Sequence, residues 1–547
     1  MARSSGDTRL ALLLLCAVAA AAVIASLLHL ATSPCAYSSQ LSRAMLSVAG
    51  LDPRLVSCGD STAKKKPLLS SDNDDVRSSN TSGTGGPIAT DFRLCFKPEL
   101  PPNALPPYRC CPPVPSSDPI NFTFPDPSEP LRVRRPVHSV GPAHLAKYAR
   151  AVALMKALPR SDPRSFYQQA NVHCAYCTGA HRQAGRPDLP VQIHFSWFFF
   201  PFHRAYLYFF ERIAAKLLGE PGFAVPFWSW DVPEGMTFPK EFAVETSPLY
   251  DPVRNPRHRP PRMVTNAALP SLFHGQPYRA GQSDKPGAGT VELCPHNTVH
   301  TWTGDISLPN VEDMGTYYSA GRDPIFYPHH ENIDRLWQAW RDIGGGKHLD
   351  FTDPDWLDAS FLFYDEEARP VRVTVRDMLD TEKLRYTYAG VGHPWLDARP
   401  PVTPGVNKAK KLKSSPPSFP VALDKAAVSA QVMRPGEPKP RREEDVVEVL
   451  VVEGIKSDGG GMVKFDVYVN AVEYEKVAPG GREMAGSYVS LRRPGMEGTV
   501  VDSSMRLVLN GLLGDLGAET DDSVTVTLVP VMGKVSVGGL RIVYMKD

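Results

Sequence analysis

The chain has 547 residues, of which 42% are hydrophobic, and a formal net charge of +1 at pH 7. This length and apolar content suffice for a large buried core and predict two or three domains. The nearly neutral balance excludes the strongly basic class of nucleic-acid-binding proteins, so no nucleic-acid partner is expected.

The N-terminal segment combines two arginines with an apolar run over residues 10–28. This order is typical of a secretory signal peptide or an uncleaved membrane anchor, which we assign to residues 1–32, with residues 10–30 as a candidate membrane tether. Residues 33–90 are rich in Ser, Asp, Asn, Gly and Lys and poor in aromatic residues, so we expect a disordered leader there. This N-terminus predicts a non-cytosolic protein and favours the secretory pathway, in a vacuole or a membrane-anchored lumenal form.

The region that follows, residues 91–395, carries almost all the histidines and most of the aromatic residues. Its helical patterns are separated by long loops that contain prolines, which predicts a mainly α domain. The stretch after Pro201 predicts a buried helix, because apolar and aromatic residues recur from His203 to Phe210 with helical spacing.

The last part of the chain changes character twice. Residues 396–418 include PGVNKAKKLKSSPPS, which has the composition of an exposed linker and predicts a cutting site for a processing protease. Residues 419–547 contain short runs such as VVEVLVVEGI and VKFDVYVN, rich in β-branched residues and divided by Gly-rich turns. This pattern predicts a C-terminal β-sandwich.

Within the α domain, the sequence CPHNTVH places His296 and His300 four residues apart, on one face of a helix. A zinc protease with this spacing needs a glutamate directly after the first histidine, and Asn297 stands there instead. The doublet His329 and His330 begins another helix, and only one of its members can face a given metal, because adjacent helical residues diverge by about 100°. His330 lies three residues before Ile333, close to the buried stripe of that helix.

Six histidines occupy segments that are otherwise apolar: His173, His194, His203, His296, His300 and His330. Six ligands are too many for one tetrahedral zinc ion, but they fit two metals with three imidazoles each. No carboxylate is interleaved at ligand spacing, and imidazole alone favours copper over a dizinc or diiron centre. The alternative is that these histidines are hydrogen-bonded core residues and that the β-domain is a protein-binding module.

With these motifs in place, the chain from Cys95 to its end resembles the plant polyphenol oxidases, the catechol oxidase and tyrosinase family of type-3 copper proteins. Three shorter motifs are similar to family marks: DPDWL at 353–357, YTY at 386–388 and VKFDV at 463–467. The resemblance implies an antiparallel four-helix bundle around a dicopper site in residues 91–345. It also implies a closing DWL-type segment in residues 346–395 and a KFDV-type β-sandwich that covers the active site.

The resemblance implies specific roles for the site residues. Two copper ions are expected, copper A on His173, His194 and His203, and copper B on His296, His300 and His330. Cys177 would form a thioether with His194, Glu292 and Asn297 would position a water, and Tyr317 would stand where many plant members have a gating phenylalanine. His329, Phe326 and Asp334 would surround the ligands, and the implied disulfides are Cys95–Cys111 and Cys110–Cys174.

The expected activity is oxidation of o-diphenols to o-quinones with reduction of the co-substrate O2 to water, by a latent proenzyme. Hydroxylation of monophenols stays open. Two alternatives are a haemocyanin-like O2 carrier and a specialised flavonoid-type biosynthetic oxidase. Many plant members are found in the plastid thylakoid lumen, which makes the plastid the alternative location.

Overall fold

The computed structural model of the chain describes residues 87–98, 100–257, 291–346, 348–396, 403, 417–436, 446–477, 481–491 and 498–546. The chain divides into two compact units, residues 1–84 and 85–547, and all described residues belong to the second. The predicted signal or anchor and most of the predicted leader lie outside the described residues. Within the described ranges, no helix is long and apolar enough to cross a membrane.

The start of the described chain corrects the predicted end of the leader. Ala89 forms a parallel bridge with Ser360, and Thr90 is fully buried in strand β1 (Thr90–Cys95). The Thr90 hydroxyl also lies 3.0 Å from the Tyr176 hydroxyl. The leader therefore ends before residue 90, because the residues just before β1 already belong to the folded domain.

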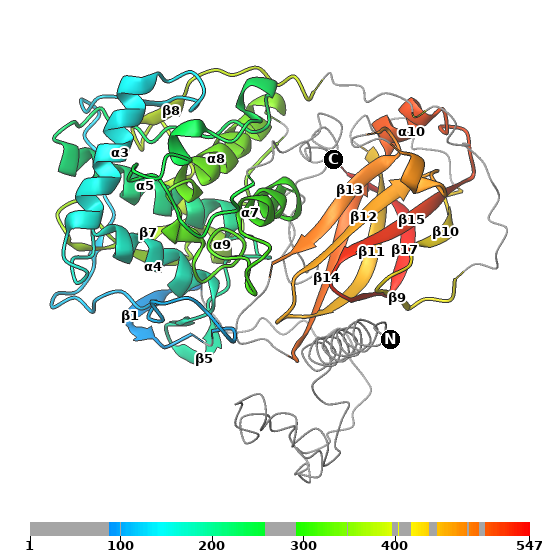
Figure 1. Cartoon of the computed structure of the whole chain (residues 1–547), viewed down its shortest axis with the longest axis horizontal. Helices are drawn as coiled ribbons and strands as arrows, with labels where there is room; N and C mark the ends of the chain where they lie inside the picture. Colours follow the sequence, from blue (N-terminus) through cyan, green and yellow to red (C-terminus); the bar gives the residue numbers. More distant parts are fainter. Residues whose placement is uncertain are drawn as a thin grey trace, which may run out of the picture. The chain divides into compact units, whose positions relative to one another are not determined.

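Five helices build the centre of the first domain: α3 (Pro142–Ala157), α4 (Phe166–Cys177), α5 (Phe199–Leu218), α7 (Asn297–Thr303) and α8 (Phe326–Ile343) (Figure 1). Helix α5 packs against both α3 and α8. Every residue from Phe199 to Glu211 is buried, which is typical of a helix in the middle of a core, and the charged side chains in this stretch are paired inside the protein. The helix predicted after Pro201 is thus confirmed, and it ends at Gly219, which adopts the left-handed conformation common at helix ends (φ 70°).

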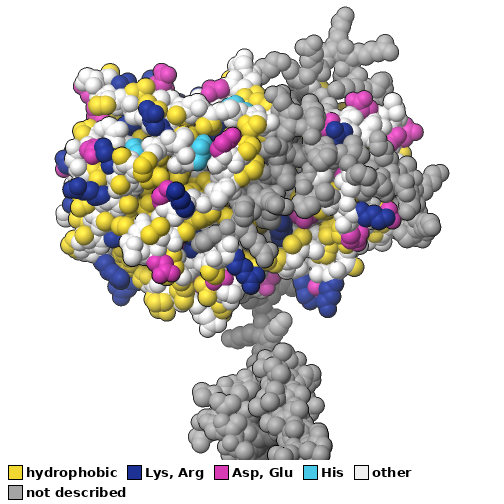
Figure 2. All heavy atoms as spheres, turned by 45° about the horizontal axis from the view of Figure 1, so that its top comes forward, with side chains coloured by type: hydrophobic (Ala, Val, Ile, Leu, Met, Phe, Trp, Pro, Cys, Tyr) yellow, Lys and Arg dark blue, Asp and Glu magenta, His cyan; other side chains and the backbone are white. Residues whose placement is uncertain are grey.

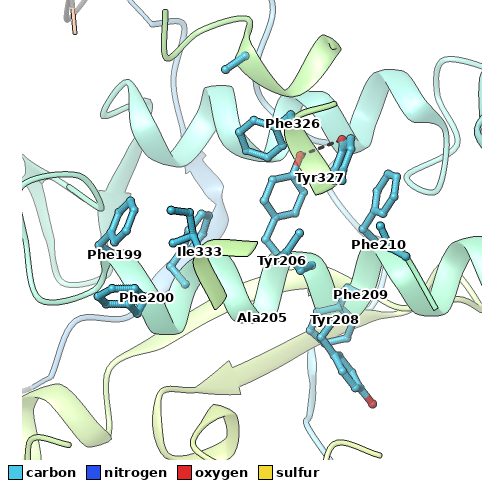
Figure 3. Packing of buried hydrophobic residues seen from close by; sticks show 14 of the residues in the cluster. Phe199, Phe200, Ala205, Tyr206, Tyr208, Phe209, Phe210, Phe326, Tyr327 and Ile333 are labelled. Carbon is cyan, nitrogen blue, oxygen red and sulfur yellow. Dashed lines mark hydrogen bonds between the residues drawn. The ribbon is translucent and has the colours of Figure 1, made fainter. Parts of the chain in front are cut away.

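Aromatic rings fill the space around α5 (Figure 3). The rings of Phe210 and Tyr327 stack with centroids 3.6 Å apart, and the hydroxyls of Tyr206 and Tyr327 are 3.1 Å apart. Each such side chain contributes about 1.5–3 kcal/mol by leaving water. This packing joins α5 to α8, the two helices that carry His203 and His330.

Short elements connect the helices. The remaining helical turns are η2 (Pro233–Gly235), η3 (Lys240–Phe242), the π-helical turn η4 (Glu292–His296), η5 (Ala320–Arg322), α9 (Pro354–Leu357) and η6 (Arg376–Met378). Three small sheets have the strand orders β1–β4 (His181–Gln183)–β5 (Arg186–Pro190), β2 (Ile120–Asn121)–β7 (Pro370–Thr374)–β6 (Ser360–Tyr364) and β3 (Arg132–Arg134)–β8 (Tyr386–Tyr388). Strands β7 and β8 pair in parallel with β2 and β3, so the segment after α8 returns to the beginning of the domain.

The C-terminal region consists of two antiparallel sheets. The first sheet has the strand order β10 (Val428–Met433), β15 (Ser523–Met532), β12 (Val463–Val469), β13 (Met484–Ser490). The second sheet has the strand order β14 (Val500–Val508), β11 (Val446–Asp458), β16 (Val535–Val537), β9 (Val421–Leu423). Strand β17 (Gly539–Lys546) also pairs with β11. Strand β12 alternates strictly, with its odd-numbered residues buried in a core to which both sheets contribute. The predicted β-rich C-terminal domain is confirmed, and it also contains the short helices η7 (Tyr474–Lys476) and α10 (Asn510–Leu516).

The two domains share their hydrophobic cores. The edge strand β13 packs against η4 and α7. Val489 and Leu491 belong to the apolar cluster of the helical domain, whereas Leu293 of η4 belongs to the core of the β-domain. This mutual insertion places one end of β13 beside the segment that begins with Glu292.

The predicted linker is only partly described, and the described part requires a correction. Thr403 is buried, and its hydroxyl donates a hydrogen bond of 3.1 Å to the Glu483 carboxylate. The prediction of an exposed segment over all of residues 396–418 is therefore wrong at Thr403, because this side chain has a partner in the β-domain.

The surface view agrees with the balanced charge of the sequence. On the face shown in Figure 2, the basic and acidic side chains of the described residues are interspersed and do not gather into a field of one sign. Electrostatic steering of a highly charged partner is not expected from this face.

A network of buried ions connects α8 with the rest of the helical domain. The Asp334 carboxylate pairs with Arg204 Nε at 2.6 Å and with Arg134 Nη1 at 3.3 Å, and it accepts hydrogen bonds from the hydroxyls of Tyr386 (2.7 Å) and Tyr388 (2.6 Å). Burial by itself would raise the pKa of Asp334, but the two arginines hold it below its ordinary value. The carboxylate is therefore ionised and fully paired.

Replacing this carboxylate should unfold the domain more easily. Asp334→Asn removes the counter-charge of the buried Arg204, whereas Arg134 keeps its pairs with Glu211 and Glu331, so we expect the free energy of unfolding to fall by about 3–5 kcal/mol. Glu220→Gln is the control, because the pair of Glu220 with Lys147 is largely exposed and contributes only about 0–1 kcal/mol. Urea unfolding of both variants measures the difference, and equal midpoints would contradict this account.

Candidate metal centre

The first group of candidate ligands comes from three neighbouring segments. His173 and Cys177 lie on α4, His203 lies on α5, and His194 lies in the segment just before α5. Their ligand atoms all lie within 4.8 Å of one another, and all four residues are buried. The structure therefore brings together the three histidines predicted for copper A.

Main-chain carbonyls fix the orientation of these rings. His173 Nδ1 lies 2.8 Å from the Tyr317 carbonyl oxygen, and His203 Nδ1 lies 2.7 Å from that of Phe199. A carbonyl only accepts, so Nδ1 must carry the hydrogen and donate it, which leaves the lone pair on Nε2. The Nε2 atoms of both rings are buried and have no hydrogen-bond partner among the described residues. The Nε2 atoms of His173 and His203 are therefore neutral, carry free lone pairs and can bind a metal ion.

The second group is built from α7 and α8. His330 Nε2 lies 3.3 Å from His296 Nε2 and 3.1 Å from His300 Nε2. His300 Nδ1 donates to the Met314 carbonyl at 2.7 Å, and His296 Nδ1 donates to Asn297 Oδ1 at 2.9 Å. The Nε2 atoms of His296 and His300 therefore both present lone pairs to His330. With its hydrogen on Nδ1, His330 would add a third Nε2 lone pair, and a cation could bind all three.

Burial keeps these imidazoles neutral. It lowers the pKa of His203 to about 3 and that of His300 to about 4, in spite of their hydrogen bonds to carbonyls. Neutral imidazole is the form that binds a metal, and it adds no negative charge to the site. The electrostatics of the pocket therefore favour ligation over protonation at ordinary pH.

His329 also lies within 4.8 Å of the second group, so the doublet offers two candidates for the third ligand. The Trp230 indole donates its hydrogen to His329 Nδ1 at 3.0 Å. Because an indole nitrogen can only donate, the neutral His329 ring must carry its own hydrogen on Nε2, the nitrogen that would otherwise bind the metal. This tautomer favours His330 as the ligand and His329 as its neighbour.

The other residues predicted around the ligands divide into two kinds. The Phe326 ring packs on the ligands, with its centroid 4.2 Å from that of His330 and 4.8 Å from that of His173. Asp334 instead lies in the buried ion network described above, in which its partners are two arginines and two tyrosines. Its contribution is to hold α8, one turn beyond His330.

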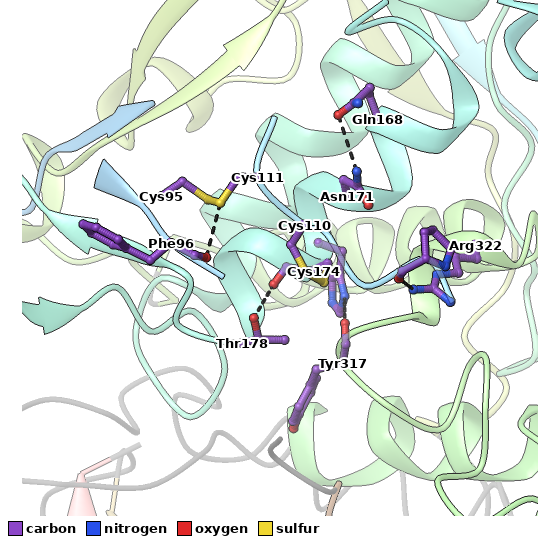
Figure 4. The surroundings of a disulfide bond; sticks show 12 residues. Cys95, Phe96, Cys110, Cys111, Gln168, Asn171, Cys174, Thr178, Tyr317 and Arg322 are labelled. Carbon is purple, nitrogen blue, oxygen red and sulfur yellow. Dashed lines mark hydrogen bonds between the residues drawn. A yellow bond between two sulfur atoms is a disulfide. The ribbon is translucent and has the colours of Figure 1, made fainter. Parts of the chain in front are cut away.

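The predicted cysteine pairs are disulfides in the structure: Cys95–Cys111 and Cys110–Cys174 (Figure 4). Cys177 is a buried free thiol whose pKa is raised by burial. Its sulfur lies within 4.8 Å of the ligand atoms of His173, His194 and His203. The thioether to His194 stays a prediction, with the reactants already adjacent.

The predicted water-positioning residues have partners that the sequence did not reveal. Glu292 Oε1 accepts a hydrogen bond of 2.8 Å from the main-chain nitrogen of Phe195, next to His194. Asn297 is fully buried and not solvated on the helix surface, and its Nδ2 donates to the Val489 carbonyl at 2.8 Å. Glu292 thus connects the two histidine groups, and Asn297 connects the second group to the β-domain.

Tyr317, the predicted gate, lies directly on a candidate ligand. Its ring centroid is 4.3 Å from that of His194, and its side chain is buried. The gating role stays a prediction, and the ring contacts a histidine of the first group. The carbonyl partners Met314, Tyr317 and Phe199 were missed by sequence reasoning, because every residue has a carbonyl and no side-chain pattern marks the ones that are used.

Comparison with known proteins agrees with this geometry. The family model described as the common central domain of tyrosinase matches residues 163–269 and 254–343, the polyphenol oxidase middle domain matches residues 350–401, and the chloroplastic polyphenol oxidase C-terminal domain matches residues 419–544. The chain is 46% identical over 508 residues to a chloroplastic polyphenol oxidase of Malus domestica, covering 84% of each chain. It is also 46% identical over 493 residues to aureusidin synthase of Antirrhinum majus, covering 82% of this chain and 87% of that one.

Solved structures show the same similarity. Latent apple tyrosinase matches with a TM-score of 0.70 and 46% identity, over 78% of this chain and all of that one. Latent aurone synthase matches with a TM-score of 0.78 and 36% identity, over 84% of this chain and all of that one.

Fold, histidine geometry and these similarities together define a copper-dependent oxidoreductase that oxidises phenols. The chain belongs to the plant polyphenol oxidases, within the tyrosinase family. Its cofactors are two copper ions, and the two histidine groups fit them, because they offer neutral imidazole nitrogens in buried positions with no competing carboxylate among them.

The assignment of the third ligand on α8 can be tested by copper content. We expect His330→Ala to lose one of the two copper ions, because it removes a lone pair that no neighbour replaces. His329→Gln should keep both, since its side-chain oxygen can still accept the Trp230 hydrogen bond. Metal analysis of protein expressed with copper measures the stoichiometry, and the opposite pattern in the two variants would reverse the assignment.

Proposed function

We propose that the protein is a latent catechol oxidase in which His173, His194 and His203 hold one copper ion and His296, His300 and His330 hold the other. The observation that carries this proposal is the arrangement of the rings. Main-chain carbonyls accept from Nδ1 of His173, His203 and His300, and the Nε2 atoms of the second group converge. The helices around them, α3, α4, α5 and α8, would form the antiparallel four-helix bundle.

The bound copper pair would take two electrons from each catechol and pass them to O2, so that two catechols reduce one O2 to two waters. The protein holds the ligands rigid and keeps them neutral through the cycle. Phe326 and Tyr317 line the ligands with aromatic surface, against which a phenol ring can pack. Glu292 and Asn297, beside the second group, would position a water that takes the phenol proton.

The β-domain supports latency. Val489 and Leu491 are buried in the core of the helical domain, and the Val489 carbonyl accepts the Asn297 hydrogen bond. While β13 stays in this position, the Asn297 amide remains hydrogen-bonded to the main chain of the β-domain. Similar proteins of known structure include latent apple tyrosinase and latent aurone synthase. We infer that the C-terminal domain covers the copper site until the chain is cut within the predicted linker, residues 396–418.

A flavonoid-type biosynthetic oxidase is the second candidate, because the aureusidin synthase of Antirrhinum majus is as similar to this chain as the polyphenol oxidase of Malus domestica. Another relative, 42% identical, is the (+)-larreatricin hydroxylase of Larrea tridentata. The copper ligands do not distinguish these substrates. Tyr317 is the residue that we expect to influence the choice, because its ring lies on His194 and carries a hydroxyl.

Cutting the linker should release the activity. We expect catechol-dependent O2 consumption to rise at least tenfold after limited proteolysis, since contacts worth only about 1.4 kcal/mol give that factor. His330→Ala, cut in the same way, controls for copper-independent oxidation. A panel with a catechol, a monophenol and a chalcone separates the candidate substrates.

Reversible O2 binding without quinone formation, in copper-loaded and cut protein, would instead identify an O2 carrier. Copper-free protein with an intact fold and normal stability would favour the structural interpretation of the histidines.

For location, we infer the plastid in place of the secretory route that the N-terminus favoured. The similar proteins of Malus domestica and Vitis vinifera are named chloroplastic polyphenol oxidases, and these names do not support a vacuole or a membrane-anchored lumenal form. The name of the Antirrhinum majus relative gives no compartment. The predicted membrane tether over residues 10–30 lies outside the described part of the chain.

A fusion of residues 1–95 to a fluorescent protein is expected to enter plastids in leaf cells. The full chain gives a second measurement, because Asn121 lies exposed on β2 within the acceptor sequence Asn-Phe-Thr. A plastid protein should show no mass change after endoglycosidase treatment, whereas secretory passage would leave this acceptor open to glycosylation. Vacuolar fluorescence with a glycan on Asn121 would contradict the plastid assignment.

A further inference from the structure

One loop contacts the ligands of both copper sites. Residues 305–319, here called the carbonyl loop, connect α7 to η5. The Met314 carbonyl accepts the hydrogen of His300 Nδ1 at 2.7 Å, and the Tyr317 carbonyl accepts that of His173 Nδ1 at 2.8 Å. Because His173 belongs to one copper group and His300 to the other, the position of this loop sets a ring in each.

A single carboxylate closes the carbonyl loop on itself. Glu312 Oε1 accepts hydrogen bonds from the Tyr318 hydroxyl at 2.5 Å and from Asn310 Nδ2 at 2.9 Å. Glu312 and Tyr318 are each 1% exposed. Met314 and Tyr317 lie between Glu312 and Tyr318 in the sequence, so the hydrogen bond joins the two ends of the segment that contains both carbonyls. Hydrogen bonds to a buried carboxylate are short and strong.

Tyr318 also attaches the loop to the rest of the domain. Its hydroxyl accepts a hydrogen bond from the Leu105 main-chain nitrogen at 2.8 Å. Its ring packs in a small cluster with the Cys110–Cys174 disulfide and Ala175, on the helix that carries His173. Burial, together with the hydrogen bond to Glu312, raises the pKa of the Tyr318 hydroxyl, so it stays protonated.

Arg322 reinforces this attachment just beyond the loop. Its guanidinium lies 5.1 Å from the centre of the Tyr318 ring and donates to the carbonyls of Leu105 (3.0 Å) and Pro107 (2.6 Å). Figure 4 shows Arg322 and Tyr317 in the surroundings of the disulfide. The loop, the N-terminal segment and α4 are thus connected through one set of buried contacts.

Glycines allow the loop to approach both ligand helices. A Cβ at Gly304, directly after α7, would overlap the Val311 carbonyl oxygen, and a Cβ at Gly321 would lie 3.1 Å from Ala170 Cα of α4. The carbonyl loop therefore lies against the end of α7, and η5, into which it continues, lies against α4.

We propose that Glu312 and Tyr318 are positioning residues for both copper ions, because their hydrogen bond holds the two carbonyls that orient His173 and His300. The inference rests on the copper ligands assigned under the proposed function. It gives a role to two residues that touch neither copper nor substrate. It also predicts that one substitution, far from the α8 ligand, weakens the two metals together.

The test is the rate of copper release. Tyr318→Phe keeps the ring and its packing but removes the hydroxyl, so the loop loses its closure. Loss of a partner that orients metal-bound histidine typically lowers metal affinity about 10–100-fold. We expect a chelator to remove both copper ions from full-length Tyr318→Phe at least about tenfold faster than from the wild type, followed by copper absorbance and by metal analysis.

The matched control is Tyr364→Phe. The Tyr364 hydroxyl donates to the Pro113 carbonyl at 2.6 Å, so the control also loses a hydrogen bond from a tyrosine hydroxyl in the same domain, but one that holds no copper ligand. Its copper release should equal that of the wild type even where its melting temperature falls as far as that of Tyr318→Phe. Glu312→Gln keeps an acceptor oxygen without the charge and should release copper faster than the wild type and more slowly than Glu312→Ala.

Several outcomes would overturn the inference and leave the proposed function intact. These are wild-type release rates in Tyr318→Phe, equal acceleration in Tyr364→Phe, or loss of only one copper ion from Tyr318→Phe. If Tyr318→Phe does not fold, the order of the two Glu312 variants decides. A wild-type protein that never holds two copper ions would instead overturn the proposed function, so the two failures are distinct.

Discussion

The copper centre depends on one constraint: each ligating imidazole must be neutral and must carry its hydrogen on the nitrogen that faces away from the metal. Carbonyls of Tyr317, Phe199 and Met314 impose this arrangement on His173, His203 and His300. Because these acceptors belong to the main chain, the ligand geometry is part of the fold itself. A backbone shift anywhere along these segments would change a copper ligand.

The segments that carry the ligands are also connected to one another by buried polar contacts. Glu292, near the second group, holds the main chain next to His194 of the first group. Asp334, one turn beyond His330, pairs with Arg204, which directly follows His203 on α5. Charged residues are costly to bury, and here each is paired or hydrogen-bonded, which makes the relative positions of α5 and α8 specific. The aromatic core supplies the apolar stabilisation, and the buried ion pairs fix how α5 and α8 are aligned with each other.

Much of this could be predicted from the sequence, because side-chain types carried the signal. Histidines in apolar segments indicated the ligands, the apolar repeat after Pro201 indicated α5, and alternating β-branched runs indicated the C-terminal domain. The choice of His330 over His329 followed from the helical repeat, and the Trp230 contact gives it a chemical reason.

The remaining features depend on tertiary contacts that leave no local pattern. Thr403 lies in a stretch with the composition of an open linker, yet it is buried because Glu483, eighty residues later, meets its hydroxyl. The resemblance implied a water-positioning role for Asn297, but nothing in the sequence indicated that its amide contacts Val489 of another domain. The carbonyl loop was invisible for the same reason, since main-chain acceptors look alike in every sequence.

The packing of β13 against the helical domain affects a binding equilibrium if the chain is cut between the two domains, as proposed. As long as the peptide is continuous, the cover is held at an effective concentration in the millimolar range, so even weak contacts keep it seated. After the cut, the same contacts must compete with dilution. The nicked enzyme would then respond to its own abundance, remaining closed in a crowded compartment and opening when the contents of a broken cell are dispersed.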